Sequence, residues 1–106
     1  MKNKNMKLIT ITAIQEFEAD LKKILKKSKV NAFSSTSVNG FSRNENSNMD
    51  DNWFGGETGN TRSILIFAFV KADCLDEVFK SIEIFNQEQE SASKIHIAVL
   101  NVEKSN

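Results

Sequence analysis

The fold is decided by the stretch Arg62-Ser63-Ile64-Leu65-Ile66-Phe67-Ala68-Phe69-Val70, a nearly continuous apolar run without helix caps. A run of this length, bounded by polar residues, is typical of a central strand that is covered on both faces of its sheet. We therefore expect it to lie in the middle of a β-sheet, and the other elements can be placed around it.

A strand and a helix are predicted at the N-terminal side. Residues 7–13 alternate between apolar and polar positions and are dense in β-branched residues, which predicts a strand. From Ile14 onward the apolar residues fall at helical spacing, with acidic residues early and lysines late. That charge order complements a helix dipole, so an amphipathic helix is predicted. Its apolar positions are Ile14, Phe17, Leu21, Ile24 and Leu25.

The middle of the chain is more polar. Asn31 to Phe41 is rich in Ser, Thr and Phe and predicts a second strand that ends near Gly40. Residues 42–61 show almost no periodicity and are dominated by Asn, Asp, Glu, Ser, Thr and Gly. We expect this span to be a long loop that is mobile without ligand, because it buries too little to offset the entropy of ordering.

The C-terminal part supplies another helix and strand. Asp73 is expected to cap the helix, which ends within residues 87–93, and Ile95 to Val102 predicts the fourth strand. The resulting order, β-α-β-β-α-β, predicts an α+β ferredoxin-like sandwich: a four-stranded antiparallel sheet with two helices on one face. Apolar side chains of residues 65–69 that point away from the helices would then face water, so another subunit should cover them.

Composition narrows the class of protein. The 106 residues are enough for one domain, residues 1–106, and the 14 basic residues balance 14 acidic ones, so we expect no nucleic-acid partner. The single cysteine, Cys74, fits a reducing compartment. The apolar run near the N-terminus is too short for a signal peptide or a membrane span, and a cytoplasmic location is expected.

Two segments resemble those of the PII-like signalling proteins. Residues 38–43 (Val-Asn-Gly-Phe-Ser-Arg) are similar to the Gly-Phe-Gly-Arg segment that ends the family's second strand and opens its T-loop. Residues 94–103 (Lys-Ile-His-Ile-Ala-Val-Leu-Asn-Val-Glu) are similar to the family's Gly-Lys-Ile-Phe-Val-Leu-Pro-Val-Glu run. The resemblance implies a homotrimer of ferredoxin-like subunits, in which residues 42–61 correspond to the T-loop.

The same resemblance implies a ligand site. Gly40, Phe41, Arg43 and Lys94 would lie at a cleft between subunits, where family members bind adenine nucleotides. The implied ligand is an adenine nucleotide or another anionic small molecule. One departure concerns the family's glycine-rich turn before the lysine, which is Ser-Ala-Ser at residues 91–93 here. Backbone amides cradle phosphate best where no side chain intervenes.

The T-loop-like segment carries the candidate partner-binding residues. Members of the family use this loop to hold transporters, enzymes or transcription factors, which makes a membrane transporter one candidate partner here. Trp53 and Phe54 either fold back on the trimer or capture that partner, since aromatic residues are enriched at binding hot spots. Glu57 completes the candidate set.

Other chemistry is less well supported by the residues. His96 is expected to be a structural or interface residue of its strand, and Cys74 a small apolar residue of the interior. No nucleophile and base can be placed together, so we do not expect an enzyme. The alternative is a metal-responsive or metal-tolerance trimer of CutA-like or metal-efflux-accessory type, which Met49, Trp53, His96 and the loop carboxylates Asp50, Asp51 and Glu57 keep open.

Overall fold

The computed structural model describes residues 6–42 and 59–106. These residues form four strands, two α-helices and two short 3-10 turns that lead into the helices. In chain order they are β1 (Met6–Ile14), η1 (Gln15–Phe17), α1 (Glu18–Lys27), β2 (Ser34–Ser42), β3 (Gly59–Lys71), η3 (Ala72–Cys74), α2 (Leu75–Glu88) and β4 (His96–Asn101).

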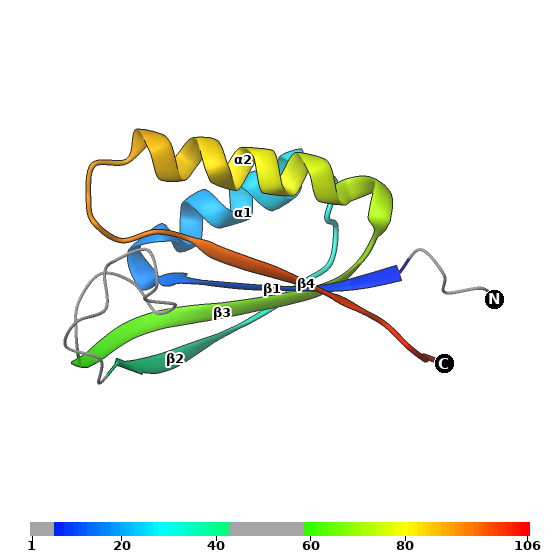
Figure 1. The fold of residues 1–106 in the computed structure, drawn as a ribbon, viewed down its shortest axis with the longest axis horizontal. Helices are drawn as coiled ribbons and strands as arrows, with labels where there is room; N and C mark the ends of the chain where they lie inside the picture. Colours follow the sequence, from blue (N-terminus) through cyan, green and yellow to red (C-terminus); the bar gives the residue numbers. More distant parts are fainter. Residues whose placement is uncertain (1–5, 43–58) are drawn as a thin grey trace.

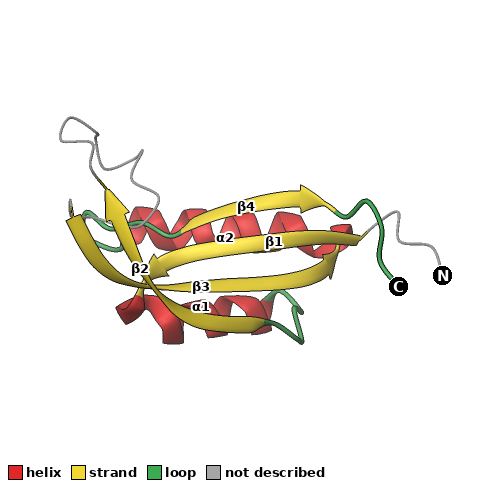
Figure 2. Ribbon diagram, turned by 90° about the horizontal axis from the view of Figure 1, so that it is seen from below, coloured by secondary structure: helices red, strands yellow, loops and turns green. Residues whose placement is uncertain are grey.

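The four strands form one antiparallel sheet in the order β2-β3-β1-β4. Both helices lie on the same face of this sheet, and the other face is open (Figure 1). Seen from the open side, β3 and β1 are the central strands and β2 and β4 are the two edges (Figure 2). The predicted ferredoxin-like sandwich is therefore confirmed, including the central position of the strand that contains residues 62–70.

The core lies between the helices and the covered face of the sheet. Strand register places Ile9 opposite Ala68 and Val99, and Ile11 opposite Ile66 and Ile97. The helices contribute side chains from their inner faces, and the rings of Phe17 and Phe85 meet edge to face with centroids 4.9 Å apart. The main buried residues of the core are Ile9, Ile11, Ala13, Leu21, Leu25, Ile64, Ile66, Ala68, Val78 and Ile82.

The open face of the sheet carries large apolar side chains. The alternation of β3 sends Ile64, Ile66 and Ala68 to the helices and the intervening side chains to the open face, where Phe67 is 39% and Phe69 55% exposed. Leu8 pairs with Phe69 on one side and with Leu100 on the other, so an apolar row crosses three strands. Within one chain, the central strand is thus covered on a single face.

The strand limits differ from the prediction in the middle of the chain. The second strand begins at Ser34 and not at Asn31, and the third begins at Gly59 and not at Arg62. The long loop was predicted to cover residues 42–61, which is wrong at both ends because Ser42 pairs with Gly59 and the ladder continues from there. The described residues do not include Arg43, Trp53, Phe54 or Glu57, so the mobility expected for that span stays a prediction.

The helix starts also differ from the prediction. Ile14 is the last residue of β1, and a 3-10 turn separates it from the start of α1 at Glu18. Asp73 was expected to cap the second helix, but it lies inside η3, and no side chain caps the start of α2. The backbone N–H of Leu75 instead bonds to Ala72 O, so the turn itself supplies a partner for a helix-start amide.

The C-terminus of α1 is closed by a Schellman motif. Lys29 has a φ of 66°, in the left-handed region, and its N–H bonds to Lys26 O at 3.1 Å. The N–H of Val30 bonds to Leu25 O at 2.9 Å, and both of these side chains are buried. Two carbonyls of the last turn are thereby satisfied, at the cost of a strained position for a residue with a Cβ.

Replacing Lys29 by glycine should stabilise the fold by about 0.5–1 kcal/mol. Glycine removes the left-handed strain, which exceeds the extra chain entropy that glycine loses on folding. Lys26→Gly is the matched control, because it places the same residue in a regular helical position and should destabilise by about 1 kcal/mol. Urea unfolding of both variants measures the two signs, and a loss of stability in Lys29→Gly would contradict the strain argument.

Candidate functional site

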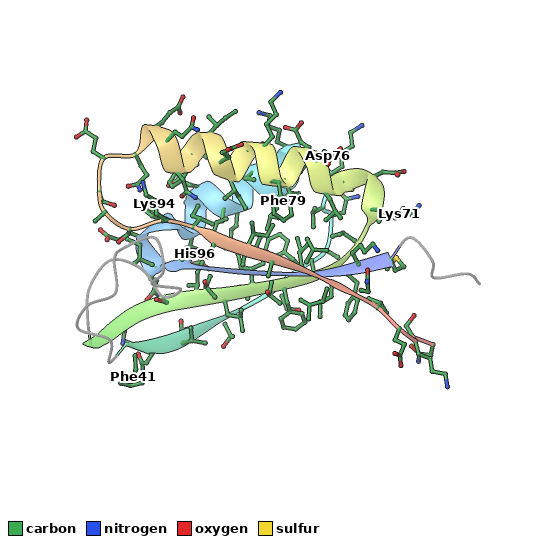
Figure 3. All side chains as sticks on the ribbon, viewed as in Figure 1. Phe41, Lys71, Asp76, Phe79, Lys94 and His96 are labelled. Atoms are coloured by element: carbon green, nitrogen blue, oxygen red, sulfur yellow. The ribbon has the colours of Figure 1, made fainter. Side chains whose placement is uncertain are left out.

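A cleft of about 1120 Å³ runs between α2 and the edge strand β4. Both elements contribute apolar side chains to its lining, but charged and amide side chains make up most of it. Figure 3 shows Phe79 on the sheet side of α2, with Lys94 and His96 beyond it toward the connection between α2 and β4. The lining residues are Asp76, Phe79, Lys80, Ile82, Glu83, Asn86, Gln87, Lys94, Ile95, His96 and Ile97.

Lys94 is held at one end of this cleft. It lies two residues before β4, and its ammonium Nζ donates to the backbone carbonyl of Asn86 at 3.1 Å. That carbonyl belongs to the last turn of α2, where the helix dipole favours a cation. The lysine predicted from the sequence as a ligand residue is thus fixed at a cleft, with its charged group partly buried.

Asn86 ties the start of β4 to the helix. Its Nδ2 donates to Ile95 O at 2.9 Å, and its Oδ1 accepts from Ile95 N–H at 2.8 Å. Ile95 itself is only 2% exposed, so water cannot easily replace these bonds. One amide side chain therefore sets where the chain enters the sheet, and with it the position of Lys94.

A second amide organises the turn between α2 and β4. Gln89 Oε1 accepts from Ser91 N–H at 2.9 Å and from Ser91 Oγ at 2.6 Å. Gln89 Nε2 donates to the carbonyls of Ser91 and Ser93. The N–H of Ser93 donates to Ser91 Oγ at 3.2 Å. The turn is thus closed by its own side chains.

The charges that line the cleft balance. Lys80 and Lys94 contribute two positive charges, and Asp76 and Glu83 contribute two negative charges, so the formal sum is zero with His96 neutral. Asp76 and Glu83 lie on α2 at exposed positions, while Lys94 is half-buried. Lys94 therefore brings a fixed positive charge to its end of the cleft, but the whole groove is not a strong anion trap.

Gly40 and Phe41 do not meet Lys94 within one chain. They lie near the end of β2, one edge of the sheet, whereas Lys94 precedes β4, the other edge. Both positions are at the same end of the sheet, but three strand spacings, roughly 14 Å, separate the edges. Gly40 is buried and Phe41 is 66% exposed. Only a neighbouring subunit could bring such residues to the cleft.

His96 and Cys74 occupy different places. His96 opens β4, is half-buried, and lines the cleft, which the sequence did not indicate. Cys74 is half-buried at the end of η3 and lines a separate hollow of about 360 Å³ with Lys29 and Lys71. Among residues 6–42 and 59–106, no group of three or more His, Cys, Asp or Glu side chains is placed to hold a metal ion. No helix in the same ranges is long and apolar enough to cross a membrane.

The sequence did not single out Asn86, Gln89 or Phe79 as site residues. Gln89 falls within residues 87–93, where the end of the helix was left open, and Asn86 directly precedes them; their partners lie up to nine residues away. Phe79 is 40% exposed and lines the cleft, and the sequence carried no signal that set it apart from the other apolar residues of the helix.

Comparison with known proteins places the fold. No family model matches the chain, and no curated protein matches its sequence. A DUF3240 family protein from Shewanella baltica superposes with a TM-score of 0.67 at 12% identity, covering 100% of this chain and 97% of that one. The structure of Arabidopsis thaliana PII bound to citrate gives a TM-score of 0.65 at 16% identity, covering 92% of this chain and 78% of the other.

A third solved structure is the nitrogen regulatory PII-like protein CPII from Thiomonas intermedia, bound to ADP, AMP and bicarbonate. Its TM-score is 0.62 at 13% identity, with 95% of this chain and 96% of that chain covered. These similarities extend over nearly the whole chain while the sequences have diverged widely. The resemblance first seen in two short segments is thus confirmed at the level of architecture, and this chain is a divergent member of the PII-like fold.

Proposed function

We propose that this chain is a PII-like regulatory protein that binds a small anionic ligand in the cleft between α2 and β4 and thereby controls a partner protein. The observation that carries the proposal is the partly buried ammonium of Lys94, fixed on Asn86 O at a cleft lined by polar and apolar side chains. A fixed, partly buried cation attracts an anion more strongly than a solvated surface lysine does. The proposed role is binding and not catalysis.

The proposed ligand site is completed by a second copy of the chain. The cleft lies along the free edge of the sheet, and the segment that begins at Gly40 lies at the opposite edge. In a closed homotrimer each β4 edge can meet the β2 end of its neighbour, so that Arg43 and Lys94 approach one ligand from two subunits. The apolar open face of the sheet would form the centre of that assembly.

The proposed output is the loop that joins β2 to β3. Because Gly40 and Phe41 stand at the base of that loop, a ligand that contacts this base more favourably in one loop arrangement shifts the population of loop states. Trp53, Phe54 and Glu57 are the proposed contacts to the partner, for which a membrane transporter or an enzyme is a candidate. The partner would then be bound or released according to the ligand.

The ligand class is an adenine nucleotide or another anionic small molecule. The apolar lining residues Phe79, Ile82 and Ile97 suit an apolar ring system, and Lys94 suits one anionic group. The neighbouring structures that hold ADP and AMP, or citrate, support an anion in this fold without assigning it to this chain. The metal-responsive alternative has no specific observation in its favour.

Calorimetric titration of ADP, AMP and citrate into the wild type, Lys94→Gln and Arg43→Ala tests this site. Each substitution should weaken an anion that binds by roughly ten- to a hundredfold, the worth of one charge-assisted hydrogen bond. Lys71→Gln is the matched control, because Lys71 is exposed at the end of the sheet far from Lys94 (Figure 3). An anion that binds all four proteins equally well would show that the site is misplaced.

A further inference from the structure

The turn between α2 and β4 offers backbone amides beside a lysine, an arrangement that usually cradles phosphate. In this chain two of those amides, of Ser91 and Ser93, already donate within the turn. The N–H of Ser91 donates to Gln89 Oε1 at 2.9 Å, and the N–H of Ser93 donates to Ser91 Oγ at 3.2 Å. A phosphate could accept from them only after Gln89 and the Ser91 hydroxyl had given up their bonds.

The electrostatics at this end of the cleft also disfavour a polyanion. Lys94 spends one of the three N–H donors of its ammonium on Asn86 O. The turn follows the C-terminus of α2, whose carbonyl ends carry partial negative charge, and Glu88 and Glu90 flank it. Lys94 brings one positive charge to this end of the cleft, which can compensate one added negative charge but not the several charges of a di- or triphosphate.

We infer that Gln89, which lies in the turn next to Lys94 and outside the lining of the cleft, determines the ligand specificity of the cleft by closing that turn against phosphate, so that the cleft takes a singly charged, carboxylate-type anion in place of a nucleotide di- or triphosphate. The inference rests on the proposed function in assuming that the cleft is a ligand site. It departs from the nucleotides held by a protein of the same fold. The difference is assigned to one side chain that the structure places in four hydrogen bonds.

Removing the Gln89 side chain should therefore create phosphate binding. We expect ADP to bind Gln89→Ala at least tenfold more tightly than it binds the wild type, because the Ser91 N–H becomes free to donate to phosphate. Asn101→Ala is the control: it removes an exposed amide side chain at the far end of β4, outside the lining of the cleft, and should leave ADP affinity unchanged. Calorimetry with ADP measures all three proteins.

A second variant tests the same inference in case the turn loses its structure when Gln89 is replaced. Ser91→Gly keeps Gln89 but removes the hydroxyl that accepts from Ser93 N–H, so it should also raise ADP affinity, and the double variant should exceed either change alone. Amide hydrogen exchange of the free wild type tests the premise without any ligand. The Ser91 and Ser93 amides should be protected in the wild type and lose protection in the double variant.

The ligand class is tested with a pair that shares its nucleoside. Adenosine 5′-carboxylic acid carries one negative charge where AMP carries a phosphate, so the wild type should prefer the carboxylate and Gln89→Ala should prefer AMP. Wild type that binds AMP more tightly than the carboxylate, or that binds neither, would overturn the assigned class.

The outcomes separate this inference from the proposed function. Wild type that binds ADP through Lys94, with no gain in Gln89→Ala, would overturn the role of Gln89 while supporting the ligand site. A gain of ADP binding in Gln89→Ala that Lys94→Gln abolishes would support both. Folded variants that gain nothing, or Ser91 and Ser93 amides that exchange freely in the wild type, would overturn the inference.

Discussion

Replacing Asn86 by alanine is expected to destabilise the fold by about 2–4 kcal/mol. The substitution removes both hydrogen bonds to Ile95 and leaves a buried backbone N–H and carbonyl without partners, each at about 1–3 kcal/mol. For a chain of this size, that loss lowers the midpoint of thermal unfolding by about 10–20 °C. Thermal unfolding followed by circular dichroism at one fixed protein concentration measures the change, since assembly would otherwise shift the midpoint.

Asn101→Ala provides the matched control for this prediction. Asn101 is the last residue of β4, and its side chain makes one exposed hydrogen bond, in which Lys7 Nζ donates to Asn101 Oδ1 at 2.6 Å. Because water can replace that partner, the control should change stability by no more than about 0.5 kcal/mol. If Asn86→Ala unfolded within about 2 °C of the control, the two hydrogen bonds between Asn86 and Ile95 would contribute nothing measurable to stability.

The order and type of the elements could be predicted because they depend on the spacing of apolar residues along the sequence. Alternation at Ile9, Ile11 and Ala13 and the helical spacing of Leu21 and Leu25 each identify a face that must be buried, and all five side chains are fully buried in the structure. Element order then leaves few topologies open. The same reasoning predicted that one alternate set of apolar residues in β3 would face away from the helices. It could not tell whether that set was Phe67 and Phe69 or Ile66 and Ala68.

Strand ends and helix starts could not be predicted in the same way. The ladder from Ser42 and Gly59 inward is set by pairing between segments that have no apolar pattern of their own. At Asp73 the expected cap was wrong because the backbone runs from β3 straight into a 3-10 turn, where Leu75 N–H already has a carbonyl partner. Local sequence cannot show which of two partners an amide takes.

The candidate site was predictable only where a family motif marked it. Lys94 came from the resemblance, and the structure places its ammonium at a cleft. Asn86, which lines the cleft, and Gln89, which closes the adjoining turn, act through hydrogen bonds to backbone atoms, and such bonds leave no periodic pattern in a sequence. A polar residue between a helix and a strand can cap, clamp or simply be solvated, and only geometry distinguishes these roles.

The assembly is expected to respond most strongly to a charge on the open face of the sheet. The wild type should sediment as a homotrimer at micromolar concentration, because the row formed by Leu8, Phe69 and Leu100 is too large an apolar surface to leave in water. Phe69→Glu should sediment as a single chain. Phe69 is 55% exposed without a partner, so glutamate there does not disturb folding, but in the trimer it would be an unpaired charge in an apolar centre.

Ile84→Glu is the control that locates the interface. Ile84 is 42% exposed on α2, where it lines the groove between the two helices on the other side of the sheet. The same charge introduced there should leave the trimer intact if subunits meet through their sheets. Should Ile84→Glu dissociate the assembly while Phe69→Glu does not, the subunits would meet through their helices. A wild type that is monomeric at this concentration would also contradict the proposed ligand site, because β2 and β4 lie at opposite edges of one sheet and Gly40 and Lys94 could not then share a ligand.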